Sequence, residues 1–220
     1  MATTSTIYPD YDGVVYNYVT DTWNNVRNAS SGTLNTAASY NVTNSHTSGR
    51  GGNTYNIGRY FLEFDTSSIN KTISSATFQL YGNSTSALDV ILFKSSQTGA
   101  VGTGDFNEIA GAGIALALSN GSGGGSLASS SAVVYSNEVA TWDTSDYNTF
   151  TLTAAAKADF IANDTFNCVM IGWDYDGRDT AVSSATYQTG FYQDAQGATS
   201  SDPKLVITEQ DNSVFFGANF

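Results

Sequence analysis

Two neighbouring segments of this chain, residues 59–69 and 73–81, alternate between apolar and more polar side chains. A period of two is typical of β-strands, because successive side chains of a strand point to opposite faces of its sheet. Each strand is therefore expected to have one face in the core and one more polar face. The side chains expected in the core are Tyr60, Leu62, Phe64, Ala76, Phe78 and Leu80.

Other short apolar segments, separated by Gly, Asn, Asp and Ser, extend this pattern along the chain. We expect strands at residues 14–19, 55–64, 76–81, 89–93, 133–135, 150–152, 168–173, 190–192 and 204–208. The alanine-rich residues 154–162, with Thr153 as their N-cap, predict one short helix. Residues 41–54 have no periodicity and are expected to form a polar loop. The fold class predicted is all-β: a single jelly-roll-like β-sandwich over residues 1–208 with one short helix.

The charge balance limits the partners of the protein. Its formal net charge is −12, with only 8 Lys and Arg residues. Like charges repel, so nucleic acid and anionic membrane surfaces are disfavoured as partners. No window is apolar enough to span a bilayer, so membrane insertion is not expected. The single cysteine, Cys168, lies in an apolar run and is expected to be a buried thiol rather than a disulfide partner or metal ligand.

The N-terminal residues contain neither a basic segment nor an apolar one, so no secretory signal is recognised. The composition nevertheless resembles that of extracellular proteins, because hydroxyl and amide side chains are abundant and charged residues make up only 13%. A virion protein combines both features, since it is assembled in the host cytoplasm and released by lysis. An extracellular location is the alternative.

Several segments together resemble DNRLRE-type β-sandwich domains, a group that includes disaggregatase-related domains and alginate-binding modules. They are residues 59–69, the run Ser-Ala-Thr-Phe-Gln-Leu-Tyr at 75–81, and residues 149–154, 169–174 and 202–207. The resemblance extends over about residues 8–208, although the tryptophan-rich middle of many relatives is represented here only by residues 141–143. It implies carbohydrate binding or a place on a particle surface rather than catalysis. Stand-alone proteins of this pattern also look like tailed-phage virion proteins.

Three carboxylates, those of Asp174, Asp176 and Asp179, surround Gly177 just after a predicted core strand. Hard oxygen ligands at alternating positions around a glycine turn suit Ca²⁺, which is the one cofactor that the sequence suggests. The match to an EF-hand loop is poor, because no Glu stands at the twelfth position. The alternatives are neutralisation by Arg178 and an Asp-rich turn capped by its own hydrogen bonds.

A host surface glycan is a candidate partner. Arg59 offers a bidentate fork to a sugar carboxylate, and Trp142 and Tyr175 flank polar loops where aromatic rings stack on sugars. The alternatives are a structural arginine held by a carboxylate across the sheet, and rings that pack in the core or at a sheet edge.

No catalytic residue is predicted. The only histidine, His46, lies in a Ser/Thr/Asn-rich stretch, and no Gly-x-Ser-x-Gly elbow accompanies it. The sequence gives no reason to select a pair of carboxylates for glycoside hydrolysis.

The C-terminal residues 209–220 form an apolar tail beyond the last predicted strand. Chain ends that are not tied down are usually polar, so we expect this tail to dock on its own domain or to insert into a neighbouring subunit. The side chains of this candidate assembly segment are Val214, Phe215, Phe216 and Phe220.

Together these features predict a non-enzymatic structural protein of a tailed-phage virion, either a capsid decoration or a component of a head or tail fibre. Its partners would be other virion proteins or copies of itself. The alternatives are a carbohydrate-binding module of a secreted polysaccharide-degrading system and a subunit of an extracellular filament.

Overall fold

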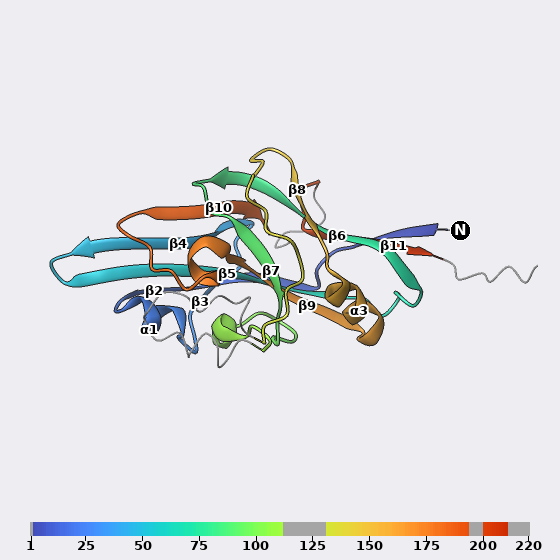
Figure 1. Cartoon of the computed structure of the whole chain (residues 1–220), viewed down its shortest axis with the longest axis horizontal. Helices are drawn as coiled ribbons and strands as arrows, with labels where there is room; N and C mark the ends of the chain where they lie inside the picture. The colour runs from blue at the N-terminus through green and yellow to red at the C-terminus, as the bar shows by residue number, and fades with distance from the viewer. Residues whose placement is uncertain (1, 112–130, 194–199, 211–220) are drawn as a thin grey trace, which may run out of the picture.

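The computed structural model describes residues 2–111, 131–193 and 200–210, most of which build an antiparallel β structure (Figure 1). The strands are β1 (Ala2–Ile7), β2 (Tyr11–Thr20), β3 (Thr33–Asn35), β4 (Ser39–Gly49), β5 (Gly52–Asp65), β6 (Thr72–Thr85), β7 (Val90–Lys94), β8 (Tyr147–Thr151), β9 (Thr165–Gly172), β10 (Thr186–Tyr192) and β11 (Lys204–Gln210). The helical segments are α1 (Trp23–Arg27), the 3₁₀ helix η1 (Thr103–Asn107), α3 (Ala154–Ala162) and the π-helical turn η3 (Trp173–Gly177). The predicted all-β, sandwich-like fold with a short helix is confirmed.

Hydrogen bonds connect the strands in the order β1-β11-β6-β10-β4-β5-β2-β3, with β8 beside β6, β9 beside β5 and β7 beside β9. Two long strands change partner along their length. The first part of β6 pairs with β11 and β8, whereas Gly82, Ser84 and Thr85 near its end pair with β10. The first part of β5 pairs with β4 and its second part with β9. Strand β6 therefore connects the two layers of the structure.

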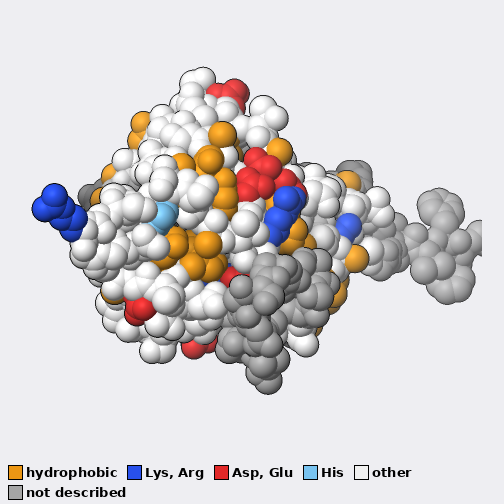
Figure 2. Space-filling model, turned by 60° about the vertical axis from the view of Figure 1, so that its left-hand side comes forward, with side chains coloured by type: hydrophobic (Ala, Val, Ile, Leu, Met, Phe, Trp, Pro, Cys, Tyr) orange, Lys and Arg blue, Asp and Glu red, His pale blue; other side chains and the backbone are white. Residues whose placement is uncertain are grey.

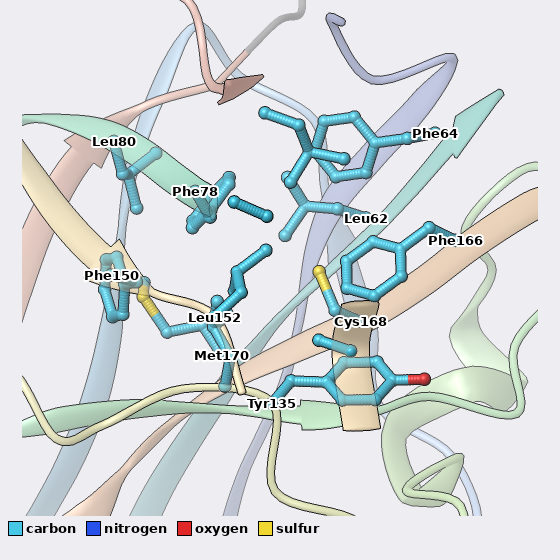
Figure 3. Close-up of a cluster of buried hydrophobic side chains, with 14 of the residues drawn as sticks. Leu62, Phe64, Phe78, Leu80, Tyr135, Phe150, Leu152, Phe166, Cys168 and Met170 are labelled. Atoms are coloured by element: carbon cyan, nitrogen blue, oxygen red, sulfur yellow. The ribbon is translucent and has the colours of Figure 1, made fainter. Parts of the chain in front are cut away.

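The main core lies between these layers. Alternate residues of β5 (Tyr60, Leu62 and Phe64) meet Phe78 and Leu80 of β6, and all five side chains are fully buried. Figure 3 shows Leu62, Phe64, Phe78 and Leu80 pointing into one cluster together with Phe150, Leu152, Phe166, Cys168 and Met170. These positions of β5 and β6 agree with the sequence-based prediction of the core.

The opposite face of β5 is buried as well, so the prediction of one polar face is wrong. Arg59 and Phe61 are fully buried there, and Glu63 is only 8% exposed. A second hydrophobic cluster covers this face, to which α1 contributes Trp23 and Val26 and η1 contributes Phe106; its other members include Val15, Ile57, Phe93, Val101, Ile109, Val169, Ile171 and Val182. Alternation shows which side chains share a face of a strand, but not what covers that face.

Residues 41–54 are not the loop that the sequence predicted. They form most of β4 and the start of β5, which pair as an antiparallel hairpin closed between Gly49 and Gly52. The hairpin projects at the left of Figure 1. The prediction failed because backbone hydrogen bonds hold these strands together, while most side chains of β4 are polar and give no apolar alternation.

The structure bears out two local predictions. Thr153 caps α3, since its hydroxyl accepts a hydrogen bond from the Ala156 N–H at 3.4 Å. Cys168 is a fully buried free thiol, and this burial raises the pKa of the thiol. Within the described ranges, no helix is both long and apolar enough to cross a membrane.

Candidate functional site

A buried network of charged side chains lies on the covered outer face of β5. Its centre is Asp176, which belongs to the π-helical turn that follows β9. The Arg59 guanidinium donates to both carboxylate oxygens of Asp176, from Nε to Oδ2 at 2.7 Å and from Nη2 to Oδ1 at 2.9 Å. Both side chains are fully buried. This bidentate geometry is the strongest form of a carboxylate–arginine pair.

Arg59 uses two further donors on backbone carbonyls. Nη1 donates to Phe106 O at 2.6 Å, and Nη2 also donates to Arg27 O at 2.9 Å. The guanidinium carbon lies 4.3 Å from the centre of the Phe106 ring, within the range of a cation–π contact. Arg59 thus fastens α1 and η1 to the sheet that they cover.

Arg27, the last residue of α1, is the second cation of the network. Its Nε donates to the Asp176 carboxylate at 3.1 Å and to the Asp176 carbonyl at 2.9 Å. Its Nη1 lies 3.3 Å from Oδ1 of Asp179, which also accepts a hydrogen bond from the Trp23 indole at 3.1 Å. Two guanidinium groups therefore face two carboxylates in the interior, as charge balance requires of buried ions.

The network keeps Asp176 ionised. Burial alone would raise the pKa of Asp176, but the charges and hydrogen bonds of Arg59 and Arg27 outweigh it and hold the pKa below its ordinary value. Burial lowers the pKa of the Arg27 guanidinium, an effect that the nearby Asp176 charge opposes. Each of these four side chains has an oppositely charged partner within the network, although Nη1 of Arg27 makes no hydrogen bond among the described residues. The network therefore connects parts of the fold rather than presenting a reactive group.

The three aspartates predicted to bind calcium are not brought together. Asp176 and Asp179 pair with the arginines, whereas Asp174 lies with Asp89 and Glu138. Asp89, Glu138 and Asp174 form what we term the acidic trio, in which one oxygen of each carboxylate lies within 4.8 Å of the others. In the described part of the chain, the trio is therefore the group of carboxylates placed to share a cation.

Arg178 stands beside the acidic trio as a competing counter-charge. It lies 3.8 Å from Glu138 and 3.8 Å from Asp174, and its guanidinium is 5.5 Å from the centre of the Trp173 ring. Figure 2 shows a face of the molecule on which acidic side chains gather beside basic ones, with hydrophobic side chains nearby.

Burial and the neighbouring carboxylate charge make Glu138 and Asp174 harder to ionise. Burial, together with a hydrogen bond and the charge of Asp89, raises the pKa of Glu138, and Arg178 only partly opposes this. Burial and the charge of Asp89 likewise raise the pKa of Asp174. A bound cation would relieve this repulsion.

The residues predicted to bind a glycan are engaged in contacts within the protein. Arg59 is internal, which matches the alternative of a structural arginine held by a carboxylate. Trp142 is half-buried and donates from its indole N–H to Gly190 O at 3.1 Å. Tyr175, also half-buried, stacks on Tyr187 with ring centres 4.6 Å apart. The three side chains do not form one binding surface.

His46 is more constrained than a loop histidine would be. It lies on β4, half-buried, and stacks on Tyr55 with ring centres 4.6 Å apart. Its Nδ1 accepts a hydrogen bond from the backbone N–H of Ser184 at 2.8 Å. These contacts give the histidine a packing role that joins β4 to the segment before β10.

Sequence reasoning missed Arg27 altogether. Arg27 stands in a polar stretch, and its partners lie 149 and more residues away in the sequence. The one available signal was indirect: Arg59 lies within an apolar strand and so needs a counter-charge. That signal could not show that α1 would bring a second cation.

Comparisons with models of protein families and with curated proteins give no match. The resemblance to DNRLRE-type domains therefore stays a prediction from the sequence.

Proposed function

We propose that this chain is a non-enzymatic structural protein of a tailed-phage virion, a capsid decoration or a component of a head or tail fibre. In this role it assembles with copies of itself or with other virion proteins. The composition and the sequence resemblance support the virion assignment, and the open edge of strand β1 supports assembly.

Strand β1 ends the order of strands in the sheet. It pairs with β11 from Ala2↔Gln210 to Ile7↔Leu205, and no other described strand pairs with it. Natural proteins usually protect such edges with charged residues or proline, because free N–H and C=O groups invite pairing with another chain. The sequence of β1, Ala-Thr-Thr-Ser-Thr-Ile, has neither, and four of its six residues are exposed.

The predicted assembly tail starts at the same end of the sheet. Gln210, the last residue of β11, pairs with Ala2, the first residue of β1. The side chains predicted to drive assembly, Val214, Phe215, Phe216 and Phe220, follow Gln210 in the sequence and lie outside the described residues. The apolar segment therefore follows, in the sequence, the strand that pairs with β1, and we propose that the β1 edge and this segment both contribute to contact between subunits.

Light scattering coupled to gel filtration tests the assembly role. We expect the full chain to form oligomers, and we expect Thr6→Lys on the β1 edge, or removal of residues 211–220, to reduce their mass. The matched control is Ser75→Lys, at an exposed position on β6 two strands away from β1, which should leave the mass unchanged. A full chain that stays monomeric at every concentration, or a β1 variant that assembles normally, overturns the assembly role.

Electron microscopy tests the virion assignment. An antibody raised against the chain, carrying a gold label, should mark capsids or tails in purified particles. Absence of label on particles whose other structural proteins are accessible to antibodies overturns the assignment.

The second candidate function is that of a carbohydrate-binding module. Exposed tyrosines favour it, because their rings can stack on sugars: Tyr8 is 48%, Tyr11 44% and Tyr18 63% exposed. A glycan array probed with the full chain tests this candidate, and a result without any bound glycan counts against it.

A further inference from the structure

Residues 180–185 form a segment of irregular backbone between the π-helical turn η3 and strand β10, which we term the strap. Its residues are exposed except for Val182, which is buried, and Ala185, which is half-buried. Val182 belongs to the second hydrophobic cluster, and Ala185 packs against that cluster. The strap therefore covers part of the second cluster.

Few hydrogen bonds hold the strap in place. Within the described part of the chain, residues 181–184 take part in one hydrogen bond, which the Ser184 N–H donates to Nδ1 of His46 at 2.8 Å. Next to them, the Ala185 carbonyl accepts a hydrogen bond from the backbone N–H of His46 at 2.9 Å. His46 is therefore the side chain that fastens the strap to β4.

The backbone has an uncommon conformation near both ends of the strap. Ser184 has a φ of 43°, and Asp179, which directly precedes the strap, has a φ of 53°. The left-handed region is unfavourable for residues other than glycine and persists where surrounding contacts hold it. Asp179 is held by the Trp23 indole and by Arg27. At Ser184 the holding contact is the hydrogen bond to His46.

The hydrogen bond from Ser184 requires the neutral form of His46. Because Nδ1 accepts this bond, the proton of the neutral ring is on Nε2, which lies 3.5 Å from the hydroxyl of Ser48. A protonated imidazole carries a hydrogen on both ring nitrogens and offers the Ser184 N–H no acceptor. Histidine is the side chain that commonly changes its charge between about pH 5 and 8, so acidification in this range removes the contact.

The surroundings of His46 add no competing ion pair. Its ring stacks on Tyr55, the titratable side chain that faces it from β5. Within the described residues, no carboxylate lies within 4 Å of a ring nitrogen of His46. The strap carries no ionisable side chain, and the charge of Asp179 before it is paired with Arg27. In Figure 2 the single histidine, in pale blue, lies at the surface beside hydrophobic side chains.

We infer that the strap is acid-sensitive: when His46 takes up a proton, residues 180–185 are released from β4 and Val182 leaves the second hydrophobic cluster. Without the acceptor, Ser184 keeps an unfavourable backbone conformation that no contact compensates. Release uncovers apolar side chains of the second cluster, and exposed apolar surface favours contact with another surface. This inference goes beyond the proposed assembly role and does not depend on it.

Amide hydrogen exchange of the full chain, followed by NMR, tests the inference. Protection factors remove the intrinsic effect of pH on exchange. That of the Ser184 amide should be about fivefold lower at about pH 5 than at about pH 7.5, as expected for the loss of one hydrogen bond. Contacts of the Val182 methyl groups with the second cluster, measured as nuclear Overhauser effects, should weaken over the same range. Amides of strand β9 are the internal control and should keep their protection.

Two variants separate the charge of His46 from its contact. His46→Asn supplies a side-chain oxygen that does not titrate, so the Ser184 amide should stay protected at both pH values. His46→Phe keeps a ring beside Tyr55 but has no acceptor, so protection should be low at both. The matched control is Ser48→Ala, at an exposed position beside Nε2, which should keep the pH dependence of the wild type.

Three results overturn the inference. The first is equal protection of the Ser184 amide at both pH values in the wild type. The second is a pH dependence in His46→Asn or His46→Phe that equals that of the wild type. The third is an equal loss of protection in β9, because acid would then unfold the protein as a whole rather than release the strap.

Discussion

Asp176 accepts both hydrogen bonds of the Arg59 fork, at 2.7 and 2.9 Å, although the two residues are 117 positions apart in the sequence. The contact closes the turn after β9 onto the middle of β5. It also places Asp176 where Arg27 can reach it from α1. One carboxylate therefore connects three parts of the chain that the sequence keeps far apart.

Arg59→Met is expected to lower the free energy of unfolding by about 3–5 kcal/mol, because it leaves the buried Asp176 carboxylate with half of its counter-charge. Arg178→Met is the matched control. Its side chain is 50% exposed and its ion pairs are long, so a loss of at most about 1 kcal/mol is expected. Urea denaturation measures both values. An Arg59→Met protein as stable as the control would show that the network does not hold the fold together.

The pH dependence of stability should reflect the opposite shifts of two sets of carboxyls. The pKa of Asp176 is lowered in the folded state, so its contribution is present above its unfolded pKa of about 3.9 and is lost only as the pH falls through the lower folded value. The pKa values of Glu138 and Asp174 are raised. The contribution of these two carboxyls to the stability of the fold is therefore fully present below their unfolded pKa of about 4. It is lost as the pH rises through their pKa values in the folded state.

Asp174→Asn should therefore be more stable, relative to the wild type, at neutral pH than at about pH 4. Denaturation curves at a series of pH values measure this difference. Asp164→Asn, a change at an exposed aspartate outside the acidic trio, is the control and should follow the wild-type profile. A constant difference between Asp174→Asn and the wild type would contradict the repulsion inferred for the acidic trio.

Strand positions with a strong apolar period could be predicted from the sequence alone. The alternation through residues 60–64 and 76–80 correctly identified the side chains between the two layers. The alanine-rich segment and Thr153 correctly identified α3. These signals are local, since they depend on strand and helix geometry and not on what lies opposite.

The covering of β5 and the partners of Arg59 could not be predicted in this way. Arg27, Phe106 and Asp176 reach Arg59 from three separate segments, and none of these carries a periodic pattern that points to β5. The acidic trio was missed for the same reason, because Asp89 and Glu138 are distant in sequence from Asp174. Such sites form only when folding brings residues that are distant in the sequence together.

Because both faces of β5 are buried, we expect Phe61 to contribute as much to the stability of the fold as a residue of the main core. Phe61→Ala should lower the free energy of unfolding by about 3–5 kcal/mol, through lost contacts and the cavity that remains. Tyr18→Ala, at a tyrosine that is 63% exposed, removes a similar ring from the surface and should change stability little. Equal effects of the two substitutions in thermal or urea unfolding would contradict the packing of the second cluster.

Calcium binding stays a prediction, and the acidic trio is the place to test it. A cation that binds only the folded state raises the unfolding midpoint by mass action. The unfolding midpoint of the wild type should rise with calcium and fall with a chelator. Glu138→Gln should lose this response. Asp164→Asn, the control, should retain it. If the unfolding midpoint of the wild type does not change with calcium, the prediction of a calcium site is wrong.

Gly82 marks the point where β6 leaves its partners β8 and β11 and turns to β10. A Cβ atom there would lie 1.9 Å from the backbone oxygen of Asp143 and 2.6 Å from the indole nitrogen of Trp142. Because backbone atoms cannot move aside as a side chain can, Gly82→Ala should cost at least about 3 kcal/mol or prevent folding. Gly51→Ala, where a Cβ would meet nothing within 4 Å, is the matched control and should fold normally. A Gly82→Ala protein with the wild-type unfolding midpoint would show that β6 does not pass this close to the Asp143 segment.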